Sequence, residues 1–353
     1  MDGPIAEYLS HKGTIAMFPF RNDIWRENAR YMQEYMCGLV DIVSKYEPVF
    51  YFCDLRFVDS LRERYKNNIN VAIIPAEYDD IWARDIGPSF IKTNGKVRCV
   101  DWSFNAWGGL KEGSYFPWDK DDAFASVVAR YFGLESSRSS LVVEGGGIIT
   151  DGAGSLFTTR SVMLNRNRNP FLKQTTVQDQ LCTASYASRI VWLQQGLALD
   201  ETNGHIDNVI SFITEEDVCL AWTDDKKNPN YTRLRKIEKT LKSLKNLNGA
   251  PYSIHRIPLP PMQYMTENES DGLCKANSID RNAGDLLPAS YLNFYMINGA
   301  VLIPSFGCET DAVAFSCFRS LFHDREVIQV YSREPLLGGG GIHCLLHEVP
   351  ALE

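Results

Sequence analysis

Apolar and polar residues alternate in four segments of the chain, and residues typical of tight turns interrupt each of them. Alternation with a period of two predicts a half-buried strand, and Asn-Gly between two such runs is a strong hairpin signal. The predicted hairpins are residues 88–102 (turn at Asn94–Gly95), 147–159 (turn at Asp151 to Gly154), 208–222 (turn through TEED) and 290–306 (turn at Asn298–Gly299).

Helical periodicity follows most of these hairpins. Residues 231–247 and 310–324 place apolar side chains three and four positions apart, as one face of an amphipathic helix does. Residues 121–133 begin with acidic side chains and end at Gly133, as helices prefer. The predicted apolar faces are Tyr231, Leu234, Ile237, Leu241, Leu244 and Leu247 in the first, and Val313, Cys317, Phe318 and Leu321 in the second. Short apolar runs at 71–77, 189–194, 252–260 and 326–332 predict further strands.

The unit of hairpin, helix and strand therefore recurs along the chain. Units that cannot bury their own apolar faces usually stack or close around a common axis. A fifth hairpin is missing unless the two chain ends combine, with IHCLLHEV (342–349) pairing with TIAMFPF (14–20). We predict such a ring of five α/β units in one domain, residues 1–353.

Polar residues stand where each hairpin begins, at positions that a strand does not need for packing. In a ring of repeats, equivalent strand ends surround one central cavity, so these side chains are expected to converge there. They are Asp85 in WARDIG, Glu144 in EGGG, Asp200, Glu201, His205 and Asp207 in DETNGHIDN, and Cys344 in GGGGIHC.

Each of these features also has a structural explanation. An Asp before a hairpin is commonly a turn or cap residue. His205 and Asp207 flank Ile206 and are expected on one side of a strand, where a structural His–Asp pair explains them about as well. A glycine-rich turn beside a cysteine is more often structural than catalytic. The recurrence of polar groups at matching places in the unit is what favours a site.

Composition narrows the classes of function. The 353 residues are 44% hydrophobic and carry a net charge of −8, which is ordinary for a globular protein and unfavourable for binding nucleic acid. No apolar stretch approaches the roughly 18–20 residues of a membrane span, and the first residues do not resemble a signal peptide, so we expect a cytoplasmic protein. The nine cysteines show no regular spacing that would indicate disulfides. No pattern indicates a homo-oligomer, although the sequence is compatible with one.

A thiol, an imidazole and several carboxylates suggest covalent chemistry on a cation. Zinc is disfavoured because paired Cys/His clusters are missing, and because His343 and Cys344, as adjacent residues of a predicted strand, point to opposite faces. A Cys–His couple is typical of nucleophilic catalysis. Carboxylates around it favour a planar cation with N–H donors, and a guanidinium group has these properties.

Many segments resemble agmatine deiminases, in the same order along nearly the whole chain. They include WARDIGPSF, VDWSFNAWGGL, YFPWDKDD, LNRNRNP, GLALDETNGHIDN, LAWTDD, YMTENES, PASYLNFYMINGA and GGGGIHC. That family belongs to the pentein, or guanidino-group-modifying, superfamily. The resemblance implies a five-bladed α/β propeller (pentein fold), in agreement with the repeat.

The resemblance also implies an activity: hydrolysis of agmatine to N-carbamoylputrescine and ammonia, in polyamine biosynthesis, without cofactor or metal. A small cationic guanidino compound is then the partner. By motif match, Cys344 is the nucleophile and His205 the general acid and base. Asp85 and Asp207 hold the guanidinium nitrogens, and Glu144 orients His205 or completes the polar site. The substrate-binding candidates are Trp82, Glu201, Asp200 and Gly341.

The chain departs from the family pattern at several positions. Gly341 stands where Asn is common, and EGGGIIT replaces a stretch that usually holds a Ser and a His near Glu144. Ala83 replaces a larger Met, and LLHEV replaces a polar ITQQ ending. These departures concern substrate detail and rate more than reaction class.

Three rival functions stay open at this point. A deiminase could act on free or peptidyl arginine, and a non-catalytic protein could capture polyamine-like cations. An amidinotransferase uses the same thiouronium intermediate but excludes water. The presence of both Cys344 and His205 disfavours mere capture, since binding needs only carboxylates and aromatic rings.

Overall fold

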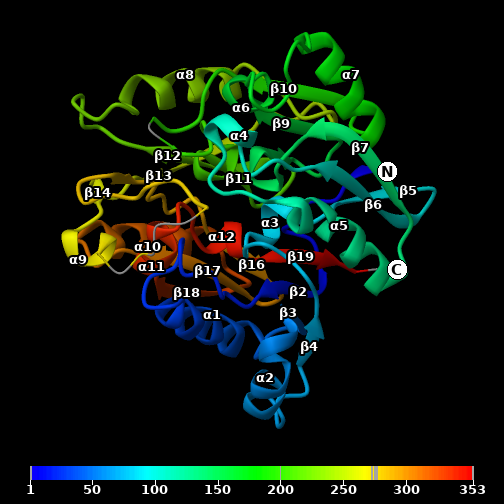
Figure 1. The fold of residues 1–353 in the computed structure, drawn as a ribbon. Coiled ribbons are helices and arrows are strands. Elements are labelled where there is room, and N and C mark those ends of the chain that lie inside the picture. The colour runs from blue at the N-terminus through cyan, green and yellow to red at the C-terminus, as the bar shows by residue number, and fades with distance from the viewer. Residues whose placement is uncertain (1, 199, 272, 274–276, 352–353) are drawn as a thin grey trace.

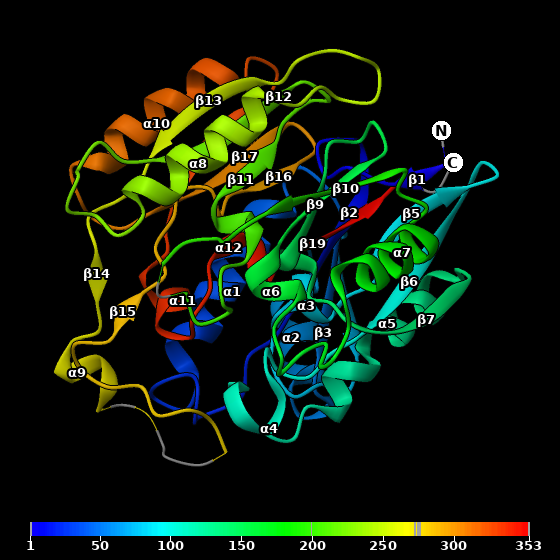
Figure 2. The same cartoon turned by 90° about the horizontal axis from the view of Figure 1, so that it is seen from above.

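The computed structural model describes residues 2–351 except 199, 272 and 274–276, and it has a mixed α/β fold (Figures 1 and 2). Within the described residues, five sheets have three or four strands and one has two. In each of the five, an antiparallel pair is extended by a parallel strand, and a helix lies between these two parallel strands in the chain. The predicted unit of hairpin, helix and strand is therefore confirmed.

Within each sheet, strands that are neighbours in the order below are hydrogen-bonded to each other. The sheets are β1 (Gly3–Pro4), β5 (Ser89–Thr93), β6 (Lys96–Ser103) and β7 (Ser136–Val142); β10 (Arg189–Leu193), β9 (Ser155–Thr159) and β8 (Ile148–Thr150); β11 (Ile210–Phe212), β12 (Asp217–Trp222) and β13 (Ser253–Pro258); β16 (Tyr295–Ile297), β17 (Ala300–Ser305) and β18 (Glu326–Tyr331); β19 (His347–Pro350), β2 (His11–Met17), β3 (Val49–Cys53) and β4 (Val71–Pro75); and the small pair β14 (Gln263–Tyr264) and β15 (Leu286–Leu287).

The longer helices connect the parallel strands, and the shorter ones lie in loops. The longer helices are α1 (Arg30–Val43), α2 (Val58–Arg64), α5 (Asp119–Phe132), α7 (Gln174–Ser185), α8 (Tyr231–Lys242) and α10 (Thr310–Leu321). The short ones are α3 (Ala83–Ile86), α4 (Gly109–Glu112), α6 (Arg160–Met163), α9 (Glu267–Ser270), α11 (Arg333–Leu337) and α12 (Ile342–Leu345), with single 3₁₀ turns η1 (Leu55–Phe57), η2 (Gly145–Gly147) and η3 (Ile206–Asn208). No helix among the described residues has the length and apolar character that a membrane crossing needs.

The two chain ends pair as predicted, but over fewer residues. β19 runs antiparallel to β2, with His347 opposite Ile15 and Val349 opposite Gly13. Residues 342–345 are not part of that strand; they form the one-turn helix α12. Only the last three residues of the predicted strand, His347 to Val349, pair with β2, because α12 takes up residues 342–345.

Two predicted helix faces need correction. α8 ends at Lys242, so Leu247 lies beyond it and is 42% exposed. On α10 the buried residues are Ala314 and Phe318, whereas Val313 is 54% exposed. Ala314 and Phe318 are four positions apart and share a face, and Val313 lies to one side of it.

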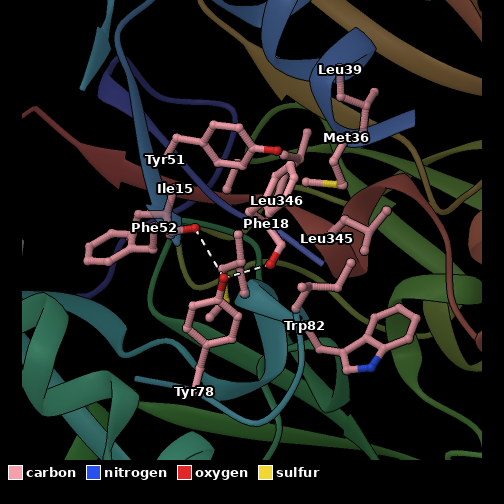
Figure 3. Close-up of a cluster of buried hydrophobic side chains, with 14 of the residues drawn as sticks. Ile15, Phe18, Met36, Leu39, Tyr51, Phe52, Tyr78, Trp82, Leu345 and Leu346 are labelled. Carbon is pink, nitrogen blue, oxygen red and sulfur yellow. Dashed lines mark hydrogen bonds between the residues drawn. The ribbon is translucent and has the colours of Figure 1, made fainter. Parts of the chain in front are cut away.

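A buried apolar cluster supports the segments that carry the polar residues. Figure 3 shows Leu345 and Leu346 packed with Trp82 and Tyr78, and all four are almost fully buried. The Tyr78 hydroxyl donates to the backbone oxygen of Phe18 at 2.6 Å. Fully burying side chains of this size stabilises by roughly 1.5–3 kcal/mol each. This packing holds α3 against α12 and so fixes the polar groups on both.

Candidate active site

Asp85 lies on the one-turn helix α3 and is held by two donors. The Gly146 amide donates to its Oδ1 at 2.8 Å, and Trp107 Nε1 donates to its Oδ2 at 2.9 Å. The carboxylate is 4% exposed. Asp85 is thus a fixed, buried carboxylate rather than a turn cap at the surface.

His205 lies between two carboxylates. Its Nδ1 is 3.8 Å from Asp85 Oδ1, and its Nε2 is 3.5 Å from Glu144 Oε2. The predicted strand geometry of this segment is wrong, because His205 immediately precedes η3 and residues 206–208 form a tight turn. The turn, not strand alternation, brings His205 and Asp207 toward the same centre.

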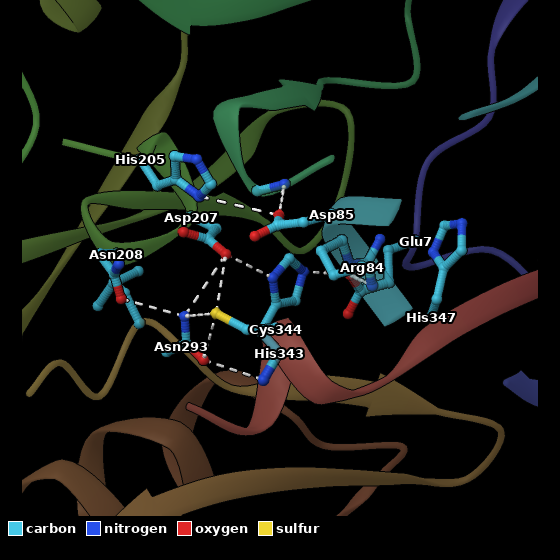
Figure 4. A network of polar contacts seen from close by, with 12 residues as sticks. Glu7, Arg84, Asp85, His205, Asp207, Asn208, Asn293, His343, Cys344 and His347 are labelled. Atoms are coloured by element: carbon cyan, nitrogen blue, oxygen red, sulfur yellow. Dashed lines mark hydrogen bonds and ion pairs between the residues drawn. The ribbon is translucent and has the colours of Figure 1, made fainter. Parts of the chain in front are cut away.

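Cys344 and Asp207 meet on the other side of this centre (Figure 4). The thiol Sγ lies 3.8 Å from Asp207 Oδ2, and Asn293 Nδ2 donates to Sγ at 3.3 Å. His343 also reaches Asp207, with Nδ1 2.9 Å from Oδ2. His343 and Cys344 were expected to point to opposite faces of a strand; on helix α12 both contact the same carboxylate.

Glu144 is fully buried and forms an ion pair with Arg168, which donates from Nε to Glu144 Oε1 at 2.6 Å. Arg168 also donates from NH2 to the backbone oxygen of Thr202, and so links Glu144 to the loop that carries His205. One oxygen of Glu144 is therefore used structurally, and the other faces His205.

The charges shift the pKa values of the acid–base groups. Burial favours neutral His205, but Asp85 and Glu144 outweigh it and raise the pKa of His205 to about 9. Burial opposes ionisation of Glu144, yet Arg168 and His205 lower its pKa to about 2. Burial and the carboxylates of Asp207 and Asp85 raise the pKa of the Cys344 thiol well above its usual range. At pH 7 these shifts favour a cationic imidazole at His205 and a neutral thiol at Cys344.

A narrow cavity leads to Cys344 and Asp85. Two aromatic rings, Trp82 and Trp107, form part of its wall, with centroids 6.0 Å apart and planes at 87°. Both indoles are anchored by hydrogen bonds, since Trp82 Nε1 donates to Asp80 at 2.7 Å and Trp107 Nε1 donates to Asp85 at 2.9 Å. The remaining lining residues are Ser114, Glu201, Thr202 and Gly338, Gly339 and Gly340. The cavity combines aromatic walls with carboxylates and suits a slender cation.

Glu201 reaches the cavity, whereas Asp200 does not line it. Arg281 holds Glu201 through two bonds, NH1 to Oε1 at 2.6 Å and NH2 to Oε2 at 2.8 Å, and also donates to the Gly338 oxygen. Asp200 accepts from the amide and hydroxyl of Thr202, so its carboxylate stabilises its own loop. The expectation that Asp200 contacts substrate is not supported by this placement.

The glycine run is explained by close approach. A Cβ at Gly340 would lie 2.3 Å from the Trp82 ring, and one at Gly341 would lie 2.4 Å from Asn293 Oδ1. Neither position has space for a side chain. Gly341 is not among the lining residues of the cavity, and its role in binding stays a prediction. It leaves room for Asn293, whose amide contacts the thiol.

Three buried polar atoms around the centre have no hydrogen-bond partner: Glu144 Oε2, His205 Nε2 and Asp207 Oδ1. Buried polar atoms are nearly always paired, so such a group of exceptions indicates where a ligand binds. Glu144 Oε2 and His205 Nε2 face each other at 3.5 Å, whereas the carboxylate oxygen Asp207 Oδ1 can accept an N–H donor from a cation. No cluster of three or more His, Cys, Asp or Glu suited to a metal ion occurs in the described part of the chain.

Sequence reasoning missed several residues that complete the site. Asn293 could have been found as a polar residue inside the apolar run SYLNFY, and His343 as the neighbour of Cys344. Arg168 and Arg281 gave no signal, because only the fold brings them to Glu144 and Glu201.

Comparisons with known proteins agree with one another over the full length. The profile of the Porphyromonas-type peptidyl-arginine deiminase family matches residues 4–350. The agmatine deiminase of Pseudomonas aeruginosa (strain LESB58) is 37% identical over 349 residues, which cover 98% of this chain and 95% of that protein.

Solved structures give the same result. The agmatine deiminase of Enterococcus faecalis is 30% identical with a TM-score of 0.94, covering 100% of this chain and 96% of that one. A Cys-to-Ser variant of C. jejuni agmatine deiminase with substrate bound is 25% identical with a TM-score of 0.85, covering 99% of this chain and 97% of that one.

Proposed function

Because the chain belongs to the Porphyromonas-type peptidyl-arginine deiminase family and, within it, to the agmatine deiminases of the pentein superfamily, we propose that it hydrolyses agmatine to N-carbamoylputrescine and ammonia. The observation that carries this proposal is the unpartnered Asp207 Oδ1, buried beside the Cys344 thiol. A guanidinium group supplies the N–H donors that this oxygen lacks and places its carbon next to sulfur.

In the proposed reaction, Asp85 and Asp207 hold the guanidinium plane against Cys344. The cation compensates for the charge of the thiolate, so the thiol ionises as substrate enters and its proton leaves to solvent. Sulfur attacks the guanidinium carbon, forming a C–S bond. His205 gives its proton to the terminal nitrogen, the C–N bond breaks, and ammonia leaves.

The same residues then release the product. A water molecule replaces ammonia, and neutral His205 takes its proton as the oxygen attacks the thiouronium carbon. The C–S bond breaks with its electron pair going to sulfur, which restores the thiolate. The remaining hydroxyl proton passes to solvent, and the carbon keeps the new oxygen as a ureido group. Glu144 keeps His205 in place through both steps, since their charges lie 3.5 Å apart.

Agmatine is the proposed substrate because the carboxylate of Glu201 lines the cavity, and a carboxylate attracts the positively charged distal amine of agmatine. Arginine carries an α-carboxylate that would meet Glu201. Arg281 lies next to Glu201, but its guanidinium is already bound to that carboxylate and to the Gly338 oxygen.

The deciding experiment compares agmatine, arginine and a peptidyl arginine as substrates, with ammonia assayed and products identified by mass spectrometry. Agmatine is expected to show the highest kcat/KM, with one nitrogen replaced by oxygen. The name of the matching family favours peptidyl arginine as the second candidate. A preference for either arginine substrate would overturn our choice.

We also propose that the five sheets form a five-bladed propeller within a single domain, residues 1–353. The repeated unit and the pairing of β19 with β2 support this proposal, since the last unit uses strands from both chain ends. If the ring depends on that pairing, deletion of residues 14–20 abolishes cooperative unfolding in a calorimetric scan.

The proposed role of His205 predicts a pH dependence. Its pKa is raised to about 9, so the proton that it donates is present at lower pH and is lost as the pH rises through about 9. The kcat/KM for agmatine should therefore fall above pH 9. A profile that stays flat to pH 11 would contradict His205 as the proton donor.

A further inference from the structure

We propose that His343, anchored by Glu7, is a positioning residue that fixes the Asp207 carboxylate with one oxygen free for the substrate. This inference rests on the proposed function and adds to it a residue from the far N-terminal segment. Figure 4 shows the connection, with the His343 ring between Asp207 and Glu7.

The Asp207 end of the connection determines which oxygen stays free. His343 Nδ1 lies 2.9 Å from Asp207 Oδ2, the same oxygen that approaches the Cys344 thiol. Asn293 Nδ2 reaches that oxygen only at 3.5 Å, so His343 provides its short contact. Asp207 Oδ1 has no partner. If His343 were absent, the carboxylate could rotate and the free oxygen would no longer be defined.

The other end of the connection is rigid. His343 Nε2 lies 2.8 Å from Glu7 Oε2. Glu7 Oε2 also pairs with Arg84 NH2 at 3.0 Å, and Glu7 Oε1 accepts from the Met296 amide at 2.9 Å. Glu7 is therefore held from two further segments and cannot follow a movement of the His343 ring.

Both ring nitrogens of His343 thus face carboxylate oxygens. Only the imidazolium form has two N–H donors, so this geometry requires a protonated ring. Burial and Arg84 oppose that charge, but Glu7 and Asp207 outweigh them and raise the pKa of His343 to about 9. In turn, burial opposes the Asp207 charge, and His343 lowers its pKa below the usual range. His343 therefore fixes both the orientation and the charge of Asp207.

Glu7 acts from outside the substrate cavity. It lines a second cavity together with His343, His347 and Glu348, and it is not among the lining residues of the cavity of Trp82 and Cys344. A substitution of Glu7 changes no wall of the substrate cavity. The direct connection from Glu7 to the substrate-binding carboxylates runs through His343 to Asp207, and a longer one runs through Arg84, the neighbour of Asp85 on α3.

The test uses Glu7→Gln and His343→Gln, with Glu47→Gln as the matched control. Glu47 is also a buried carboxylate paired with a histidine, His11, at 3.3 Å, but it does not contact Asp207. We expect Glu7→Gln and His343→Gln to lower kcat/KM for agmatine by about 10- to 100-fold, because small misplacements of binding groups cost that much. Glu47→Gln should lower thermal stability by a similar amount and leave kcat/KM within about twofold.

A shift of the pH profile separates positioning from a loss of stability. Without the Glu7 charge, the pKa of His343 is lower, and its ring becomes neutral at a lower pH. The fall of kcat/KM on the alkaline side therefore begins at a lower pH than in the wild type. In His343→Gln the Asp207 pKa rises, so the acid fall of kcat/KM moves upward. Neither fall should move in Glu47→Gln.

The outcomes distinguish this inference from the proposed function. If the wild type does not convert agmatine, the proposed function fails. If the wild type is active and Glu7→Gln matches Glu47→Gln in kcat/KM and pH profile, the positioning role of His343 is overturned. Reduced kcat/KM with both pH shifts supports it.

Discussion

Replacing Cys344 by serine is expected to lower kcat for agmatine by on the order of 10⁴-fold or more, the scale of losing a catalytic nucleophile. A hydroxyl has a far higher pKa than a thiol, and the site already raises the pKa of the thiol it holds. Agmatine should still bind, because Asp85 and Asp207 keep their partners. Ammonia release measures the rate, and calorimetric titration measures the binding.

Cys317→Ser is the control for this substitution. Cys317 is a partly buried cysteine on α10, away from the lining of the cavity, so its replacement should leave kcat unchanged. Ammonia release by Cys344→Ser within tenfold of wild type would remove Cys344 as nucleophile. Cys344→Ser also suits a crystallographic test with agmatine.

Gly146→Ala is expected to reduce kcat/KM by about 10²-fold or more, although it adds one methyl group. A Cβ at this position would lie 2.6 Å from His205 Nδ1, 2.8 Å from Asp207 Oδ2 and 2.9 Å from Asp85 Oδ1. These are distances that no Cβ tolerates, so at least one of the three side chains has to move. Steady-state kinetics with agmatine measure the loss.

Gly38→Ala provides the comparison, because a Cβ there meets no atom within 4 Å and the residue lies inside α1. We expect it to stabilise the fold by roughly 0.5–1 kcal/mol and to leave kcat/KM unchanged. If Gly146→Ala kept kcat/KM within twofold of wild type, the close packing of the three side chains around Gly146 would be wrong.

Local patterns predicted much of the fold. All four hairpins form where alternation and turn residues indicated them, since a turn and its flanking strands depend on neighbouring residues. The one-turn helix at 342–345 could not be predicted, because four residues are too few to show a helical period. The same holds for η3 at 206–208, whose alternation resembled a strand.

The recurrence of polar residues at the hairpin starts identified Asp85, Glu144, His205, Asp207 and Cys344, and these five lie around one centre. It did not identify which of their neighbours support them. Asp200 and Gly341 were predicted to contact substrate, but one bonds to its own loop and the other packs against Asn293.

By itself, the sequence determined the repeated unit and the residues available for chemistry, because alternation, turns and residue types are local properties. The pairing of the chain ends followed from the repeat, since the fifth hairpin was missing unless the two ends combined. Only the tertiary structure decided the partners of those residues. Glu7 lies 336 positions from His343, and His343 lies 136 positions from Asp207. Contacts over such separations depend on how the sheets pack. That packing leaves no space for a side chain at Gly340 beside Trp82 or at Gly341 beside Asn293, and it leaves one oxygen of the Asp207 carboxylate without a hydrogen-bond partner.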